Sequence, residues 1–295
     1  MRMNSSRIAL SKVLLPVDFS EKSVEAARYA VKLLKSFRPQ VTLLHVLTQH
    51  YGFDMPGLEN EELTRFLAED ESNARTQLEK FLKPDFRNLN MKRVLIKGDP
   101  AQRIVEYAHS EKFNLIIMPT HGRGPFRRRL LGSVTAKVLH DVKTPVLTGV
   151  HMEKAGVGKS TVPRRIICGL NLSTEAAGTL RWAARLASRY KARLTAVHVI
   201  PSFEFPGEGY GPPGWTRLAT EKPTKALSTL LRRCSVDAQI HLEAGNVPEA
   251  LSSTVTELRA NLLAIGRGPV AATGGRLSTN AYAIIRTCPC PVVSV

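Results

Sequence analysis

Long hydrophobic runs and abundant cysteine are both missing from this sequence. No stretch approaches the roughly 18 consecutive apolar residues that a membrane-spanning helix needs, so we expect no membrane partner. The N-terminal residues carry positive charge but no apolar segment followed by a small-residue cleavage site, which argues against secretion. Four cysteines in 295 residues do not make a disulfide framework. We therefore expect a soluble, cytoplasmic protein.

Metal-ligand clusters are also scarce. Cys288 and Cys290 flank Pro289 at a spacing that could offer two thiolates to a metal. No second pair of Cys or His stands near them at ligand spacing, and Cys168 lies in an apolar run typical of a protein core. We predict no metal site.

Acidic residues are outnumbered, with 25 Asp and Glu against 42 Lys and Arg, which gives a net charge of +17 spread over both halves. Such a field favours anionic partners, among them nucleotides and nucleic acid. Aromatic residues make up only 6% of the chain, which leaves few stacking platforms for single strands, and no recognition motif is present. We expect no specific nucleic-acid partner.

The chain contains an internal repeat. Residues 12–20, an apolar run followed by a turn and a serine, recur at 165–173, so that Asp18 corresponds to Asn171. Three further segments recur in the same order: 41–46 with 194–199, 98–100 with 245–248, and 114–119 with 261–266. The duplication predicts two domains, 1–150 and 164–295, joined by a linker at 151–163.

Each half alternates short runs of Val, Ile and Leu with longer segments of helical period, the pattern of βαβ units. The predicted fold class is α/β, with two tandem doubly wound domains that each hold a five-stranded, mainly parallel sheet. In the first half, strands are expected near residues 12–17, 41–47, 92–97, 115–119 and 145–150.

The linker holds a misleading motif, because Gly158-Lys159-Ser160-Thr161 looks like the end of a P-loop. The full motif needs a glycine where Glu153 stands, with a strand leading in and a helix leading out. Val162, Pro163 and another apolar run follow instead. We predict no P-loop here.

A candidate ligand site follows the first and fourth predicted strands. In an open α/β sheet, ligands bind outside the carboxyl ends of the strands, where the strand order reverses. Asp18 follows the first strand and could accept hydrogen bonds from a base or ribose. A glycine-bearing loop, 119–133, follows the fourth strand and leads into a predicted helix at 134–141.

The chemistry of that loop suits a phosphate. Gly132 lets backbone approach a ligand, Ser133 could cap the helix and donate to an oxygen, and the N–H groups at the helix start favour an anion. Arg123 and Arg127 to Arg129 add positive charge. Simpler interpretations stay open: Asp18 as a turn or cap residue, Gly132-Ser133 as a helix cap, and the arginines as a solvated loop.

With these residues in view, the sequence resembles a tandem member of the universal stress protein family, over almost all of both halves. Nucleotide-binding members carry Pro-x-Asp after the first strand, His-Val at the second, and a loop G-x-x-G, nine residues, G-S/T after the fourth. The matching segments are Pro16-Val17-Asp18, His45-Val46, Gly122 and Gly132-Ser133. Pro119 stands where the first glycine belongs, and proline removes an N–H from any ligand contact there.

The resemblance implies a fold like those of the adenine nucleotide alpha hydrolases and Rossmann domains, with ATP, with or without Mg, as ligand. It places Asp18 and Val46 on the adenine or ribose side and Met118 in the pocket lining. The residues implied to hold the phosphates are Gly122, Gly132, Ser133, Val134 and Thr135. It also implies pairing of the two domains through their final strands, 146–150 and 292–295, with a homodimer as a further option.

The second copy departs further from this pattern. Gly266 supplies the glycine that Pro119 replaces, but the following loop is one residue shorter. Asn171 replaces the aspartate, and Ser278-Thr279 replaces Gly132-Ser133. We therefore expect a second site that binds weakly or is only structural.

Three functions are compatible with the sequence. The first is a non-enzymatic, ATP-binding regulatory protein with one working site in the first domain. The second is a slow ATP hydrolase on the same scaffold, for which Asp18 and His121 are the nearby candidates. The third is an interaction module that binds no nucleotide and uses its positive surface.

Overall fold

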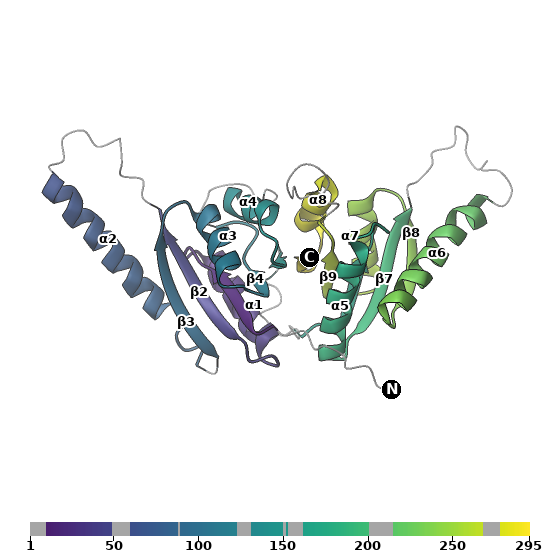
Figure 1. Ribbon diagram of the computed structural model, residues 1–295, viewed down its shortest axis with the longest axis horizontal. Helices are drawn as coiled ribbons and strands as arrows, with labels where there is room; N and C mark the ends of the chain where they lie inside the picture. Colours follow the sequence, from purple (N-terminus) through teal and green to yellow (C-terminus); the bar gives the residue numbers. More distant parts are fainter. Residues whose placement is uncertain are drawn as a thin grey trace. The chain divides into compact units, whose positions relative to one another are not determined.

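The computed structural model describes residues 10–48, 60–87, 89–122, 131–149, 152, 162–200, 215–267 and 278–295. The chain forms two compact units, one of Ala9–Val146 and one made mainly of Leu147–Val295, and each contains one copy of the repeat (Figure 1). The predicted linker with its P-loop-like sequence lies almost wholly outside the described residues, and so do Arg123 and Arg127 to Arg129. The domain boundaries at 150 and 164 stay predictions.

The first repeat alternates strands and helices as the sequence predicts. The strands are β1 (Lys12–Pro16), β2 (Gln40–Leu47), β3 (Asn90–Lys97), β4 (Leu115–Ile117) and β5 (Val146–Thr148). The helices are α1 (Glu21–Leu34), α2 (Asn60–Lys80), α3 (Pro100–Ser110) and α4 (Ser133–Asp141). The strand order is β3-β2-β1-β4-β5, and the pairing of β1 with β2 and β4 is parallel.

The second repeat has the same arrangement. Its strands are β6 (Arg165–Gly169), β7 (Arg193–Ile200), β8 (Gln239–Ala244), β9 (Leu262–Ile265) and β10 (Val292–Ser294). Its helices are α5 (Ala176–Tyr190), α6 (Trp215–Cys234), α7 (Val247–Glu257) and α8 (Thr279–Thr287). The order β10-β9-β6-β7-β8 repeats that of the first domain, which confirms the predicted pair of doubly wound α/β domains.

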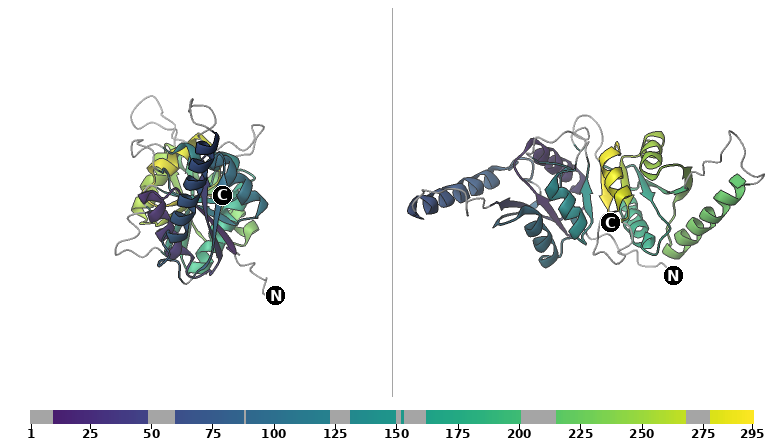
Figure 2. Two further views of the ribbon diagram at one scale, coloured as in Figure 1. Left: turned by 90° about the vertical axis from the view of Figure 1, so that its left-hand side faces the viewer. Right: turned by 90° about the horizontal axis from the view of Figure 1, so that it is seen from above.

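This strand order fixes where a ligand can bind. The chain moves outward from β1 to β3 and then returns to β4 beside β1, so right-handed connections place α1 and α2 on one face and α3 and α4 on the other. Figure 2 shows helices flanking the strands of each domain. The carboxyl ends of β1 and β4 therefore form the switch point, as do those of β6 and β9 in the second domain.

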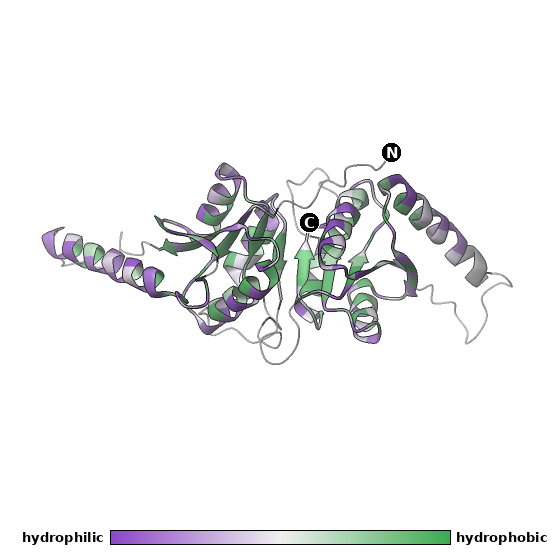
Figure 3. Ribbon diagram, turned by 90° about the horizontal axis from the view of Figure 1, so that it is seen from below, coloured by the Kyte–Doolittle hydropathy of each residue, from purple (hydrophilic) through white to green (hydrophobic). Residues whose placement is uncertain are grey.

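Both domains bury the central strands of their sheets. These strands are largely hydrophobic, whereas the helices carry both hydrophilic and hydrophobic residues (Figure 3). Leu14, Leu43 and Ile116 are fully buried in the first domain, and Ile166 and Cys168 are fully buried in the second. Burial raises the pKa of the Cys168 thiol, as expected for a residue that packs in the core.

The strands begin or end one to two residues from their predicted limits. β4 ends at Ile117 rather than at Pro119, because proline has no N–H to continue a ladder. β2 and β3 each begin earlier than predicted, at Gln40 and Asn90, where the two strands pair with each other.

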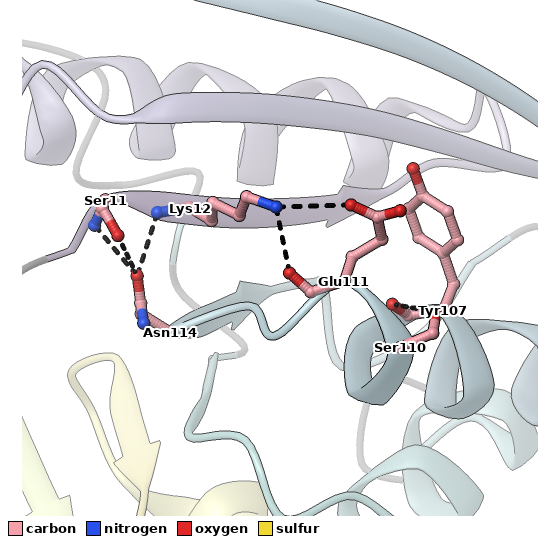
Figure 4. Close-up of polar contacts among 6 residues, drawn as sticks. All are labelled: Ser11, Lys12, Tyr107, Ser110, Glu111 and Asn114. Carbon is pink, nitrogen blue, oxygen red and sulfur yellow. Dashed lines mark hydrogen bonds and ion pairs between the residues drawn. The ribbon is translucent and has the colours of Figure 1, made fainter.

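One matched residue of the repeat holds the amino end of the sheet. Asn114, just before β4, accepts hydrogen bonds at Oδ1 from the backbone N–H of Ser11 and Lys12, both at 2.9 Å (Figure 4). Asn261 accepts from the N–H of Arg164 and Arg165 in the same way, at 3.0 and 3.2 Å. The repeated asparagine is therefore a structural clamp at the end of the sheet opposite the switch point.

A second pair of matched residues caps helices. Asp99 caps α3 by accepting from the N–H of Gln102 at 2.8 Å, and Asn246 caps α7 by accepting from the N–H of Glu249. The N–H of Gln102 and the charge of Lys137 lower the pKa of Asp99 from its ordinary value of 3.8. The second domain thus shows that asparagine suffices at this position.

We expect Asp99→Asn to leave stability at pH 7 nearly unchanged, whereas Asp99→Ala should lower the free energy of unfolding by about 1 kcal/mol. A depressed folded-state pKa means that the carboxylate stabilises the protein above its unfolded pKa and loses this contribution as pH falls through the folded value. Urea unfolding at pH 7 and near pH 3 measures both effects. Equal acid sensitivity of wild type and Asp99→Asn would contradict the assignment.

Candidate functional site

The turn after β1 is built around Asp18. Phe19 has a left-handed φ of 63°, which turns the chain sharply into α1. Asp18 Oδ1 accepts hydrogen bonds from the N–H of Ser20 at 3.0 Å, from the Ser20 hydroxyl at 2.6 Å, and from the Ser23 hydroxyl. Ser20 also caps α1 by accepting from the N–H of Ser23. Oδ1 of Asp18 therefore serves as an acceptor within the turn, as the simpler interpretation held. Any role of Asp18 in ligand binding depends on its second carboxylate oxygen, Oδ2.

The other oxygen of Asp18 faces the segment after β4. A Cβ built on Gly122 would overlap Asp18 Oδ2, so the glycine backbone lies directly against the carboxylate. Two motif residues more than a hundred positions apart thus meet at the switch point between β1 and β4. This contact explains why a glycine stands at 122 without any special φ: it is the lack of a side chain that the site requires.

His45 supports the same turn from β2. Its Nδ1 lies 2.8 Å from the carbonyl oxygen of Val17, and because a carbonyl only accepts, Nδ1 carries the proton. The ring also stacks on Phe19 with centroids 4.3 Å apart. The motif His45-Val46 therefore has two parts, a histidine that positions the turn and a buried valine, and the role of the histidine was not predicted from the sequence. The recurrence of this histidine as His198 in the second repeat could have indicated a structural role, since His198 makes the equivalent contact, 2.8 Å from the carbonyl oxygen of Leu170.

Backbone and side-chain bonds close the base of the loop between β4 and α4. The N–H of Gly132 donates to the carbonyl of Thr120 at 2.8 Å. The hydroxyl of Thr135, in the first turn of α4, donates to the carbonyl of Pro119 at 3.0 Å. Met118 and Thr135 are both buried here. Pro119 thus lacks an N–H, but its carbonyl is held in place.

The expectation that Ser133 caps α4 is wrong. Gly132 is the N-cap residue, without a side-chain cap bond, and Ser133 is the first residue of the helix, one earlier than predicted. A glycine cap leaves the first-turn N–H groups without a side-chain acceptor from the cap residue. Ser133 is exposed, so its hydroxyl and the amides of Ser133, Val134 and Thr135 form a helix start suited to an anion.

The predicted site residues therefore fall into two groups: residues buried on the strands, and residues that contact one another after the strands end. Pro16 and Val17 are buried at the end of β1 and Val46 is buried on β2. Asp18 and Gly122 touch, and Gly132 lies against the backbone of His121, where a Cβ would come within 3.2 Å. His121 itself lies with Nδ1 2.9 Å from the Thr120 hydroxyl.

The second domain keeps the scaffold of this site but changes its groups. Leu172 repeats the left-handed turn with a φ of 59°. Asn171 accepts from the N–H of Ser173 at 3.2 Å, and the N–H of Ser278 donates to the carbonyl of Arg267 at 3.0 Å. Ser278 caps α8 with its own side chain, accepting from the N–H of Ala281, so this cap fills a position that Gly132 leaves open.

An arginine also enters the second switch point. The Arg267 side chain, at the position of Thr120, reaches the carbonyl of Ser294 at 3.2 Å. Burial lowers the pKa of this guanidinium to about 10. The second copy has thus exchanged a carboxylate for an amide and a small residue for a partly buried cation.

Both repeats match one family. The model of the universal stress protein family aligns with residues 10–148 and again with residues 163–295. The chain belongs to the universal stress protein family. The two matched segments agree with the tandem organisation that the internal repeat predicts.

Individual relatives agree with this assignment. The chain is 31% identical over 136 residues to the universal stress protein MJ0531 of Methanocaldococcus jannaschii, an alignment that covers 46% of this chain and 79% of that protein. It is also 31% identical over 156 residues to MJ0577 of the same organism, covering 48% of this chain and 94% of the relative.

A solved structure extends the likeness to both domains. A universal stress protein from Archaeoglobus fulgidus superposes with a TM-score of 0.70, covering 97% of this chain and 98% of that one, at 21% sequence identity. At this identity the likeness concerns the fold, and it spans the tandem arrangement.

Two further observations concern membranes and metals. None of the helices in the described parts of this universal stress protein has the length and hydropathy of a membrane-spanning segment. The thiols of Cys288 and Cys290 lie 3.6 Å apart, and the described residues hold no cluster of three metal-ligating side chains. The neighbouring Cys288 thiol and, after it, burial raise the pKa of Cys290, which keeps it protonated.

Proposed function

We propose that this universal stress protein is a regulatory protein that binds an adenine nucleotide, ATP, in its first domain. The observation that supports this most is the contact of Gly122 with Asp18 Oδ2, because it joins the two halves of the motif at the switch point. In this proposal, the Asp18 carboxylate accepts from the ribose or adenine, beside the buried Val46. Met118 lines the apolar side.

The phosphates would lie at the start of α4. The N–H of Gly132 is already bonded to Thr120, so the groups proposed to hold an anion are the amides of Ser133, Val134 and Thr135, together with the Ser133 hydroxyl. Thr135 contributes its amide alone, since its hydroxyl holds Pro119. Gly122 has no side chain that would displace the Asp18 carboxylate from the site.

The proposal gives this site no catalytic step. Phosphoryl transfer needs a carboxylate that holds a metal and a group that positions water. Oδ1 of Asp18 already accepts three hydrogen bonds within its own turn, which reduces its capacity as a Mg ligand. His121 directs Nδ1 to the Thr120 hydroxyl. Slow ATP hydrolysis is the second candidate function, and it would depend on Asp18 and His121.

Calorimetric titration of the purified protein with ATP tests the proposal. We expect binding of one ATP per chain with a Kd in the micromolar range, about −8 kcal/mol. Mass spectrometry of the small molecules released on denaturation provides an independent measurement. If neither experiment detects bound adenine nucleotide, the proposal is wrong. If the protein hydrolyses ATP in the presence of Mg and His121→Ala abolishes this hydrolysis, the second candidate function is favoured.

A further inference from the structure

A pocket of about 460 Å³ opens in the second domain between α6 and the turn that follows β6. α6, which runs beside β8 in Figure 1, lines one side with residues spaced three or four apart, and Leu172 and Ser173 form the other side. The pocket shares no residue with the β9–α8 segment, which corresponds to the proposed phosphate site, whereas Leu172 and Ser173 lie in the turn that corresponds to the Asp18 turn. Its volume lies in the range of small-molecule sites, about 300–1,000 Å³.

The lining combines positive charge with an apolar surface. Lys222, Lys225 and Arg233 contribute cations, and none of the described lining residues is acidic. Leu172 and the buried Leu230 supply the apolar part. None of the three cations makes an ion pair with another residue that the structure describes. The Glu175 carboxylate lies beside Ser173 on the opposite side of the pocket from the helix. The three cations on α6 outnumber it and create a positive potential that a negatively charged ligand would neutralise.

The first domain carries different residues at the positions that correspond to this pocket. With the repeat offset of 153 residues, Lys222 corresponds to Glu69 and Lys225 to Ser72. Phe19, the counterpart of Leu172, packs against Phe81 with ring centroids 5.8 Å apart. In the second domain, smaller side chains, Leu172 and Cys234, take the places of these two rings. Two of the three cations and the smaller side chains are therefore particular to the second copy, whereas Arg233 corresponds to Lys80 and keeps its positive charge.

We propose that this pocket binds a small organic anion that carries at least two negative charges and an aromatic or aliphatic body. The charges lie among Lys222, Lys225 and Arg233, and the apolar body lies on Leu172 and Leu230. The inference concerns the second domain alone and does not depend on nucleotide binding by the first.

Pyranine, a fluorescent pyrene with sulfonate groups, is a suitable probe because it has both parts. We expect its fluorescence anisotropy to rise on binding to the full-length protein, and Arg233→Ala to weaken this binding by about tenfold. Arg232→Ala is the matched control, since it removes the same charge from the same helix outside the pocket and should change binding by less than about twofold. Equal losses in both variants would show a diffuse charge effect and overturn the proposal.

A variant that fills the pocket without changing its charge tests whether binding depends on the space in the pocket as well as on the cations. Leu172→Phe installs the residue that the first domain carries in the same left-handed turn, so the variant should fold, as circular dichroism can verify. We expect it to lose pyranine binding although its charge is unchanged. Retained binding in Leu172→Phe, absence of binding to wild type at about 1 mM probe, or loss caused by Gly122→Ala instead would each refute the assignment.

Discussion

Replacing Gly122 with alanine should abolish ATP binding and lower the free energy of unfolding by about 2 kcal/mol. The added Cβ would overlap Asp18 Oδ2, so the carboxylate or the loop must move. Displacing Asp18 breaks its hydrogen bonds to Ser20 and Ser23, which define the start of α1. A single methyl group would thus separate the two segments that form the switch point.

A glycine whose missing side chain faces open space provides the control. Gly178 lies inside α5, and a Cβ there would meet no atom within 4 Å. Gly178→Ala should therefore raise the free energy of unfolding by about 0.5–1 kcal/mol, since alanine favours the helix. Urea unfolding and ATP calorimetry on both variants give the comparison. Normal ATP affinity in Gly122→Ala would show that the contact with Asp18 has no part in binding.

The second large effect is expected at Asp18. Asp18→Ala should lower the free energy of unfolding by about 2 kcal/mol, because the N–H of Ser20 and the hydroxyls of Ser20 and Ser23 lose a charged acceptor. The variant should also lose ATP binding. Because both effects come from one substitution, alanine alone cannot separate the turn from the ligand site.

Asp18→Asn makes that separation. Asn171 accepts from the N–H of Ser173 in the second domain, so an asparagine can support this turn. We expect Asp18→Asn to unfold within about 1 kcal/mol of wild type and to bind ATP at least about tenfold more weakly, because the amide replaces a charged acceptor. Denaturation and calorimetry again measure the two properties. Wild-type affinity in Asp18→Asn would leave Asp18 as a turn residue and remove it from the proposed site.

These two predictions also bear on Pro119. The proline removes one N–H from the loop, and yet the Thr135 hydroxyl holds its carbonyl at 3.0 Å. The Thr135 hydroxyl thus fixes the position of the backbone at residue 119, but no group at that position replaces the hydrogen-bond donor that proline lacks. If ATP binds, it must do so through the start of α4 rather than through residue 119.

The sequence by itself determined the duplication, the fold class and the pairing of equivalent residues. These follow from local patterns: apolar runs typical of a buried parallel sheet, and repeated segments that align Asp18 with Asn171 and Asn114 with Asn261. The helix cap at Asp99 was not predicted, although the capping side chain and the N–H it accepts from are only three residues apart.

Tertiary structure alone decided what each motif residue touches. That Gly122 lies on Asp18 and that His45 holds the turn depend on contacts between segments distant in sequence. That Gly132 rather than Ser133 caps α4 is seen in the backbone conformation of Gly132. The basic pocket beside α6 depends on the same kind of contact, since neither Leu172 nor Lys222 signals it separately. Side-chain periodicity reports which face of an element is buried, whereas the identity of the neighbour is set when the sheet brings remote strand ends together.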